Sequence, residues 1–547
     1  MLPLYFSLLC LLLIPNMNIK FSFDTAWVAK VRHYFDTVIT PKTVVAFAMF
    51  FSIITIIYCY NNDVIIAYGD AESHLNIAKR VITSLTPGFA QLGGIWLPLP
   101  HIMMVPFIWI DPLWRSGIAG SIVSGFAYVI SCLFLYLTTY KLTKSKLSSF
   151  ICFIIFALNP NILYLQTTAM TELVLIMFFI LSTYWFINFL RNPDNIIALL
   201  ATAFFGFCAS LSRYDGWFLV LFQALAIILL YIFRKGKWKE MEGKLVLFCT
   251  LAFFGIALWM LWDFLILHDP FYFTNSQFSA KTQQQNWLSK GELPGYHNII
   301  VSSAYYFVTS MANTGILIFL TALGGFFLYM RNHRTLKDYL MALVLLVPFI
   351  FNVTTLFLGQ SVIFIPHLTP VTFEWKLFNV RYGVMMMPVV ALFFAYLFYK
   401  LPTPGRLILV GIFFAQIALY LVGYSAVISY DDGIVGLSHA KRPDAERWLA
   451  KEYDGGLVLL DDYARTVSII RSGLPMQNVI YVGNKPYWEE SFYAPEKYAK
   501  WVVMQKDDAV WKGINNNTII RGRLYKYFSK VYTSPETLIF KRNPAVK

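Results

Sequence analysis

Charged residues are scarce in this chain of 547 residues: Asp, Glu, Lys and Arg make up only 14% of it. Hydrophobic residues account for 58%, and the mean hydropathy is +0.58. A soluble globular protein carries about 25% charged residues, so this composition excludes one and predicts a polytopic membrane protein. The aromatic content of 18% agrees, because Tyr and Trp gather where a membrane meets water.

Cysteine is also sparse, and several familiar motifs are missing. The six cysteines are scattered singly through apolar stretches without a CxxC pair, which argues against a disulfide framework and against a zinc site. The polar part beyond residue 429 has no glycine-rich loop of phosphate-binding spacing, so nucleotide binding is not indicated. Much of the net charge of +14 falls in short loops between apolar runs, which favours a topology signal over nucleic-acid binding.

Long apolar runs predict about eleven membrane-spanning helices in a transmembrane domain over residues 43–428. Short basic connections alternate with less basic ones, the first of which is the outer loop 61–113. Basic loops stay in the cytoplasm, so the N-terminus is expected inside and the C-terminus outside. Residues 1–42 then form a cytoplasmic or interfacial segment, in which 1–15 receive no assignment. The predicted spans are 43–60, 114–140, 148–165, 171–190, 195–212, 215–233, 244–266, 309–330, 338–358, 383–400 and 406–428.

Residues 429–547 have the composition of an ordinary soluble domain. Helices alternate there with short buried strands, which is typical of a small α/β domain. The fold class predicted is therefore an all-α polytopic membrane protein with a small extracytoplasmic α/β domain at its C-terminus. The clearest expected elements are a helix at 444–452 and strands at 457–460, 479–482, 501–504, 530–533 and 538–540.

An acidic sequence, YGDAESHL, opens the first outer loop. Apolar residues then recur at helical spacing, which predicts an amphipathic helix along the outer membrane surface. Asp70 lies at its N-terminal end, four residues before His74, while Glu72 points elsewhere. An isolated aspartate there would be a helix N-cap. Because ionised groups beside a bilayer are costly unless they face water or a substrate, we interpret Asp70 and Glu72 as candidate catalytic carboxylates, with His74 and His101 in the acceptor pocket.

Three further charged residues lie at the outer ends of predicted spans: Glu172, Arg213 and Arg381. Glu172 begins a span. Two explanations of this carboxylate are equally good: a negative charge is favourable in the first turn of a helix, or Glu172 is catalytic and faces Asp70. Each arginine either pairs with a nearby carboxylate or snorkels to the interface, or it binds a phosphate, for which guanidinium geometry is suited.

The loop 267–298 is long, polar and aromatic. Loops of this length are often functional. A carbohydrate-binding surface would use aromatic and amide side chains such as Tyr272 and Gln277, and so would a plain surface loop. Both residues are candidates for the substrate pocket.

Six short motifs, in this order along the chain, resemble those of the glycosyltransferase C superfamily, in particular of members related to protein O-mannosyltransferases and to the aminoarabinose transferases that modify lipid A. The similarity covers roughly residues 43–400. It implies a prokaryotic plasma-membrane enzyme that moves a sugar, mannose being one candidate, from a polyprenyl-phosphate carrier, with Asp70 as general base. The adjacent Asp-Glu pair of the O-mannosyltransferases is broken here by Ala71, which displaces the glutamate to Glu72. The motifs are Gly69-Asp70 with its helix, Trp96–His101, Met170–Glu172, Ser212–Gly216, His268–Phe273 and Asn379–Tyr382.

The chemistry of glycosyl transfer fits these residues. It needs a base at the acceptor hydroxyl and positive charge at the departing phosphate, and Asp70 and the two arginines are candidates for these roles. The expected reaction is a single displacement with inversion. No cofactor is expected. Relatives such as oligosaccharyltransferases hold a divalent metal, but Asp70 and Glu172 offer fewer oxygen ligands than Mg²⁺ or Mn²⁺ recruits, so a metal is the less favoured alternative.

The expected partners are the lipid-linked donor, a protein, lipid or glycan acceptor, and membrane lipids. The alternative function is a transporter or flippase for a lipid-linked sugar. Transporters place charged residues near the bilayer midplane, often beside broken helices, whereas the charges singled out here lie at the outer ends of spans. A non-catalytic scaffold leaves those charges unexplained.

Overall fold

The computed structural model describes residues 37–233, 238–435, 443–462 and 467–544. Most of the predicted segment 1–42 and the predicted basic connection at 234–237 lie outside these residues. The chain divides into two compact units, and the first outer loop groups with the C-terminal residues rather than with the predicted transmembrane domain. The helical unit comprises Met1–Tyr58, Ser124–Gln166 and Thr171–Asp432, and the mixed unit comprises Cys59–Val123, Thr167–Met170 and Gly433–Lys547.

Six segments of the described chain are helices long and apolar enough to cross a membrane, and three bent pairs raise that number to as many as nine. The six are α3 (Pro41–Asn61), α7 (Ile118–Thr143), α10 (Glu172–Arg191), α12 (Asp215–Phe233), η2 with α21 (Val380–Met386 and Met387–Lys400) and α22 (Thr403–Leu421). The bent pairs are α13 (Trp238–Ala252) with α14 (Phe254–Leu267), α17 (Ile299–Thr314) with α18 (Ile316–Asn332), and α19 (Leu336–Leu345) with α20 (Val347–Phe357).

Two predicted spans are shorter helices in the structure. The run 148–165 is divided into α8 (Lys146–Ala157) and α9 (Pro160–Leu165), because Asn159 caps the second helix and proline occupies its first turn. The run 195–212 is α11 (Ile196–Ser210). The helical unit also contains α15 (Tyr272–Asn275), α16 (Ala280–Ser289) and most of α23 (Ile428–Val435).

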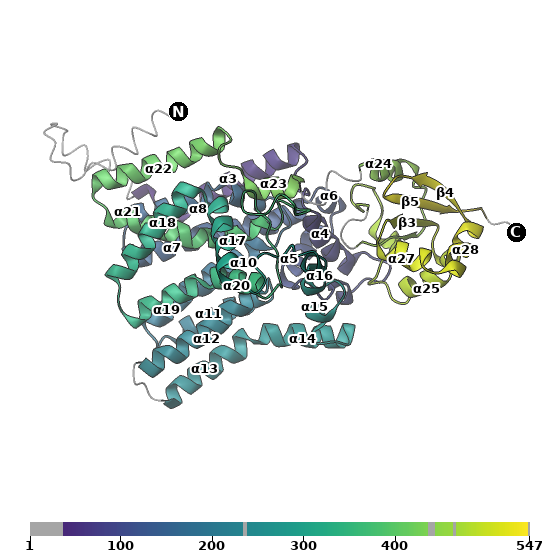
Figure 1. Ribbon diagram of the computed structural model, residues 1–547. Coiled ribbons are helices and arrows are strands. Elements are labelled where there is room, and N and C mark those ends of the chain that lie inside the picture. The colour runs from purple at the N-terminus through teal and green to yellow at the C-terminus, as the bar shows by residue number, and fades with distance from the viewer. Residues whose placement is uncertain (1–36, 234–237, 436–442, 463–466, 545–547) are drawn as a thin grey trace. The chain divides into compact units, whose positions relative to one another are not determined.

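Glycines allow close helix contacts in the helical unit, where α11, α12 and α13 lie side by side (Figure 1). A Cβ at Gly325 of α18 would lie 2.0 Å from the carbonyl oxygen of Phe393 in α21. A Cβ at Gly216 would lie 2.2 Å from the carbonyl oxygen of Ala209. Small residues bring helix backbones together in this way in membrane proteins, where packing rather than the hydrophobic effect joins helices.

The pair α17 and α18 bends by 113°. The break lies at Gly315, whose φ of +91° suits glycine. The backbone N–H of Leu317 donates to Gln416 Oε1 of α22 at 3.0 Å. A side chain thus satisfies a donor that the break leaves without a helical partner.

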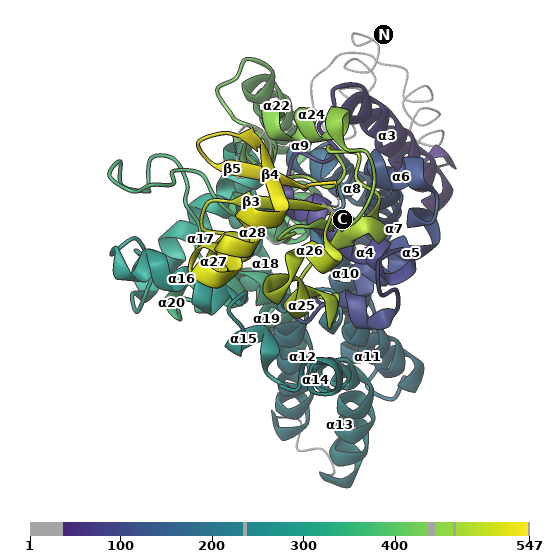
Figure 2. The same ribbon diagram turned by 90° about the vertical axis from the view of Figure 1, so that its right-hand side faces the viewer.

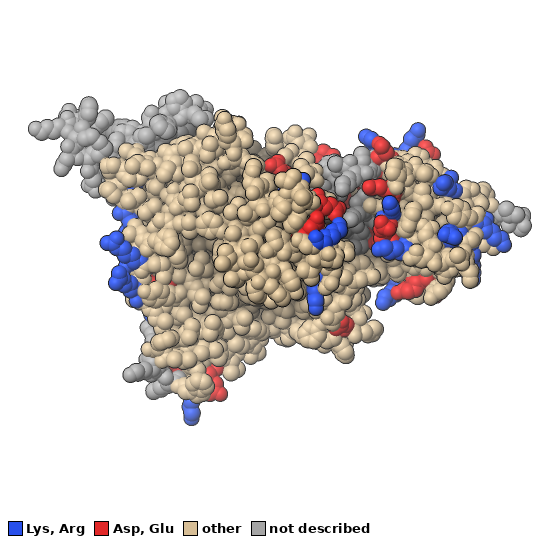
Figure 3. Space-filling model, viewed as in Figure 1, with Lys and Arg blue, Asp and Glu red and all other residues tan. Residues whose placement is uncertain are grey.

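Basic residues gather at one edge of the helical unit (Figure 3). Three connections predicted to be cytoplasmic meet there: Arg191 Nη2 donates to the carbonyl of Lys141, and Lys337 Nζ donates to the carbonyl of Arg191, both at 3.1 Å. The structure therefore brings together loops that the charge pattern assigns to the same side of the membrane.

The mixed unit contains a five-stranded sheet in the order β2-β1-β3-β5-β4 (Figure 2). The strands β2, β1 and β3 are parallel, while β5 is antiparallel to both β3 and β4. Every residue of β3 is buried, as expected of a strand covered on both faces. The strands are β1 (Val458–Leu459), β2 (Val479–Ile480), β3 (Trp501–Gln505), β4 (Phe528–Thr533) and β5 (Thr537–Arg542), and they confirm the predicted α/β domain.

Helices cover this sheet. Val502 and Met504 of β3 belong to a core that also holds residues of α25, α27 and α28, while Trp501 points to Trp448 of α24 at 6.3 Å between ring centroids. Leu85 of the first outer loop packs against the same core. The helices of this domain are α24 (Pro443–Glu452), η3 (Met476–Asn478), α25 (Tyr487–Tyr493), α26 (Pro495–Tyr498), α27 (Ala509–Asn515) and α28 (Thr518–Tyr527).

The first outer loop forms α4 (Gly69–Ile82), η1 (Phe89–Leu92), α5 (Leu99–Ile108) and α6 (Asp111–Arg115). α4 confirms the predicted helix, but it differs from a helix lying on a membrane surface, because nine of its residues are buried. Even Lys79 and Arg80 are enclosed: Lys79 Nζ donates to the carbonyl of Ile108 at 3.2 Å and pairs with Asp111. Partners within the mixed unit thus bind the Lys79 ammonium group in place of water.

Candidate active site

A buried ionic cluster forms in the helical unit around Glu172, the first residue of α10. The Glu172 side chain is 0% exposed, and its Oε1 accepts hydrogen bonds from Arg213 Nη1 and Arg381 Nε, both at 3.1 Å. Its Oε2 accepts no hydrogen bond from the described residues. The sequence predicted all three residues as site candidates, and the structure brings them together.

Arg213 lies in the short connection between α11 and α12. Its Nε donates to Asp215 Oδ2 at 3.3 Å, and its Nη1 also donates to Thr171 Oγ1 at 3.1 Å. Burial lowers the pKa of Arg213, but the negative charges of Glu172 and Asp215 outweigh it and hold the pKa above its usual value. The side chain is still 18% exposed, and within the described chain no residue accepts from its Nη2. One edge of the guanidinium is therefore open to a ligand.

Arg381 belongs to η2. The preceding turn contains Asn379 in the left-handed region at φ 55°, which an asparagine tolerates. Arg381 Nη1 donates to Asn379 Oδ1 at 3.1 Å and lies 3.7 Å from Asp432 Oδ2. The ring of Tyr382 lies 5.1 Å from the central carbon of both guanidinium groups. Tyr382 therefore forms a shared wall for the two arginines.

A network of buried amides fixes η2. Asn313 Nδ2 donates to the carbonyl of Val380, the residue before the arginine, at 2.7 Å. Asn313 Oδ1 accepts from Ser429 Oγ at 2.8 Å, and the carbonyl of Asn313 accepts from Asn159 and Asn161 Nδ2, both at 2.9 Å. Sequence reasoning missed these residues, because single amides far apart in the chain carry no spacing signal.

An apolar pocket adjoins the ionic cluster. Asp215, whose Oδ1 has no hydrogen-bond partner among the described residues, is its one charged lining residue. The pocket volume of about 10 Å³ is room for about one water molecule. The other lining residues are Leu175, Ile176, Phe179, Leu219, Val347, Pro348 and Met385.

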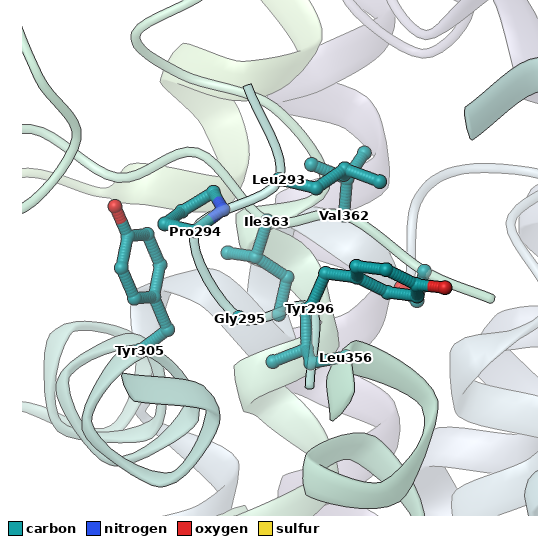
Figure 4. A pocket seen from close by; sticks show the side chains of 9 residues that line it. Leu293, Pro294, Gly295, Tyr296, Tyr305, Leu356, Val362 and Ile363 are labelled. Carbon is teal, nitrogen blue, oxygen red and sulfur yellow. The ribbon is translucent and has the colours of Figure 1, made fainter. Parts of the chain in front are cut away.

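A second pocket lies between α17, α20 and the turns at 293–296 and 361–363. Tyr305 and Tyr296 flank it with Ile363 between them, and no charged residue lines it (Figure 4). It therefore offers no charged side chain to a phosphate.

In the mixed unit, Asp70 and Glu72 both lie in the first turn of α4 and are half-buried. The N-cap residue is Tyr68, so Asp70 is not the cap of this helix. Glu72 Oε1 accepts from Ser468 Oγ at 2.7 Å and from the backbone N–H of Ile470 at 3.3 Å. Glu72 thus holds a segment of the C-terminal domain against α4.

His74 and His101 form a buried pair, with His74 Nδ1 at 2.8 Å from His101 Nε2. The ring of Trp96 lies 4.6 Å from that of His74. Burial lowers the pKa of His101 to about 3, an effect that the Leu97 backbone offsets only in part. His101 is therefore neutral near pH 7, and the pair joins α4 to α5.

Arg80 is a residue that sequence reasoning overlooked. It forms an ion pair with Asp462, and its guanidinium lies 3.8 Å from the ring centroid of Tyr481. Asn76 Nδ2 lies 3.5 Å from Asp462 Oδ1. One face of α4 thus binds the C-terminal domain. The amphipathic pattern gave a signal, because Asn76 and Arg80 are four residues apart.

The two residues predicted from loop 267–298 differ in setting. Tyr272 is half-buried in α15, and burial raises its pKa. Gln277 is exposed. The neighbouring Phe273 stacks on Tyr214 with 5.5 Å between ring centroids, so α15 packs beside the connection that carries Arg213.

Within the described residues, no group of three His, Cys, Asp or Glu side chains is placed to hold a metal ion. Glu172 Oε2 and Asp215 Oδ1 are buried acceptors without hydrogen-bond partners there. Two oxygens are fewer than Mg²⁺ requires unless waters complete its shell.

No family model matches the chain, and no curated protein matches its sequence. Among solved structures, ArnT from Cupriavidus metallidurans bound to undecaprenyl phosphate has a TM-score of 0.53 at 11% identity, covering 95% of this chain and 98% of that one. The same protein in the apo state has a TM-score of 0.51, also at 11% identity, covering 89% and 96%. The archaeal oligosaccharyltransferase AglB from Archaeoglobus fulgidus reaches 0.48 at 12% identity, covering 92% and 74%. The likeness to ArnT confirms the predicted fold: the chain has the glycosyltransferase C fold.

Proposed function

We propose that the protein is a membrane glycosyltransferase that moves a sugar from a polyprenyl-phosphate carrier to an acceptor hydroxyl at the outer face of a prokaryotic plasma membrane. The observation that carries this proposal is the ionic cluster, in which Glu172 orients Arg213 and Arg381. Guanidinium groups bind phosphate through fixed N–H geometry. The similar ArnT structure contains undecaprenyl phosphate.

In this proposal Glu172 positions the arginines and does not react itself. Its buried carboxylate spans both guanidinium groups, so their N–H groups are oriented before the donor arrives, which is how preorganised sites stabilise developing charge. The cluster contains three carboxylates, with Asp215 and Asp432, against two arginines. In this proposal the cluster binds a phosphate through hydrogen bonds from guanidinium N–H groups of fixed direction, and not through an excess of positive charge.

We propose Asp70 as the general base. A base must be ionised, and the first turn of a helix favours a charged carboxylate. Glu72 accepts hydrogen bonds from Ser468 and Ile470, so in this proposal Glu72 positions the C-terminal domain and Asp70 is the base. Attack by the acceptor on the anomeric carbon, with departure of the lipid phosphate, is a single displacement and inverts the configuration at that carbon. Transfer is expected to need no metal.

The test is transfer of labelled sugars from a panel of polyprenyl-phosphate donors in membranes that contain the wild type, Asp70→Asn or Asp63→Asn. General-base help is worth about 10²–10⁴-fold, so Asp70→Asn should lose at least about a hundredfold. Asp63→Asn is the matched control. It removes another carboxylate of the same segment, and the Asp63 side chain is 76% exposed. If the wild type moves lipid-linked sugar across the membrane without transferring it, the flippase alternative holds instead.

A further inference from the structure

Asp263 is a buried carboxylate that the proposed reaction does not use. It lies in α14, an apolar helix, and is 0% exposed. Neither of its oxygens has a hydrogen-bond partner among the described residues. A carboxyl group buried in this way is destabilising, and ionisable residues inside membrane segments usually mark a functional site. Burial of Asp263 therefore lowers the stability of the fold, and no hydrogen bond from the described chain offsets this loss.

The surroundings of Asp263 are aromatic. Burial first, and Asp263 in addition, raise the pKa of both Tyr214 and Tyr272. Trp259 lies one turn before Asp263 in α14, and α15, which carries Tyr272, contacts α14. Phe273 stacks on Tyr214. An acceptor of hydrogen bonds among aromatic rings matches a sugar, whose hydroxyl groups donate and whose C–H faces pack on rings.

The place of Tyr214 in the chain, next to Arg213, indicates that the sugar bound near Asp263 is the one carried by the lipid phosphate. Tyr214 directly follows Arg213, whose open edge is the candidate phosphate contact. In a lipid-phosphate sugar the ring is bonded to the phosphate through one oxygen. A phosphate at Arg213 therefore leaves its sugar near the segment of the chain that carries Tyr214.

We propose that Asp263 binds hydroxyl groups of the sugar that is transferred, with Tyr214 and Tyr272 as the walls of this subsite. The proposal rests on the function proposed above. The sugar enters when α15 moves aside from the carboxylate. No residue of α15 is fully buried, and its displacement breaks the ring contacts of Phe273 with Tyr214 and Trp217. The bound hydroxyl groups then supply the hydrogen bonds that the carboxylate lacks.

The experiment compares purified wild type, Asp263→Leu and Asp263→Asn in nanodiscs. It measures binding of polyprenyl phosphate carrying glucose, mannose or arabinose, binding of polyprenyl phosphate without a sugar, and thermal unfolding. With the sugar lipid that the wild type prefers, Asp263→Leu should bind about tenfold to a hundredfold more weakly, as expected from the loss of the hydrogen bonds between the sugar hydroxyl groups and Asp263. Sugar-free lipid should bind as it does to the wild type, and the Tm should stay equal or rise.

The control is Asp338→Asn, a carboxylate with satisfied hydrogen bonds to Thr335 and Tyr329. It should lower the Tm and leave the preference for sugar-bearing lipid unchanged. The subsite is refuted if Asp263→Leu keeps that preference, or weakens both lipids equally with a lower Tm, while the proposed transferase function stands. If the wild type binds none of these lipids, the transferase function fails and the subsite with it.

Discussion

One carboxylate oxygen of Glu172 accepts hydrogen bonds from two guanidinium groups in the helical unit. Removing one partner of a buried ion pair leaves an uncompensated charge and costs about 3–5 kcal/mol. We expect Glu172→Ala to lose stability in this range and to abolish donor binding, as measured by thermal unfolding and lipid binding. Glu374→Gln removes one partner of an exposed pair with Lys290 and should change stability by less than about 1 kcal/mol. Equal losses in the two variants would contradict the positioning role.

Asp508 makes the C-terminal domain sensitive to pH. Burial raises its pKa to about 7, although the N–H groups of Trp511 and Gln505 donate to it and lower the pKa, and Asp461 raises it further. Between about pH 4 and pH 7 the folded state keeps a proton that the unfolded state releases. Stability should therefore fall as pH rises through this window.

Asp508→Asn keeps an acceptor at the N-cap of α27 but cannot ionise. We expect it to remove that pH dependence and to raise the Tm at pH 8, as measured by thermal unfolding of the full chain across the window. A wild type whose Tm does not fall between pH 4 and pH 7 would show that Asp508 titrates normally.

At the scale of elements, the contact between α18 and α21 depends on one glycine. A Cβ at Gly325 would meet the Phe393 carbonyl oxygen at 2.0 Å, whereas at Gly324 the nearest atom is Leu397 Cδ2 at 3.9 Å. Both changes to alanine favour the helix by about 1 kcal/mol, but only the first is overpacked, at a cost of about 1–3 kcal/mol. We expect Gly325→Ala to lower the Tm and Gly324→Ala to leave it equal or higher. Equal Tm values would mean that the two helices separate without cost.

Sequence periodicity predicted the existence of most elements, because apolar runs of span length and short buried strands are local signals. It predicted α4, the helix at 443–452 and all five strands. It did not predict the division of run 148–165, although the Asn-Pro pair that divides it was visible. It also placed α4 on a membrane surface, because an amphipathic pattern does not show whether water or protein covers the polar face.

At the scale of the whole molecule, the basic edge sets the expected orientation. The connections at 141, 191 and 337 meet there, and basic loops are retained in the cytoplasm. We expect a membrane-impermeant maleimide to label Lys451→Cys in intact cells, and to label Arg334→Cys only after permeabilisation. The five described cysteines are buried or half-buried, so wild-type cells provide the background. The opposite pattern would invert the topology.

The candidate site was only partly predictable at this scale. Glu172, Arg213 and Arg381 stood out because charge is rare at the ends of spans. Their mutual hydrogen bonds, the amides that fix η2 and the burial of Asp263 follow from tertiary contacts between segments far apart in the chain. The histidine pair shows the same limit, since its 2.8 Å contact joins residues 27 positions apart.

The bend at Gly315 has a consequence for the order in which the protein is made. Two helices that meet at 113° do not cross a bilayer as one straight helix. The bent arrangement of α17 and α18 depends on residues that hydrogen-bond to this region. The residues that bind this region all come later in the chain. Gln416 accepts from the backbone N–H of Leu317 at the break, and Asn313 bonds to Val380 and Ser429. A nascent chain that stops before residue 429 already contains every apolar run of the helical unit, yet it lacks the Ser429 hydroxyl that donates to Asn313. The amide network that fixes η2 is therefore completed only by a residue that follows the last apolar run.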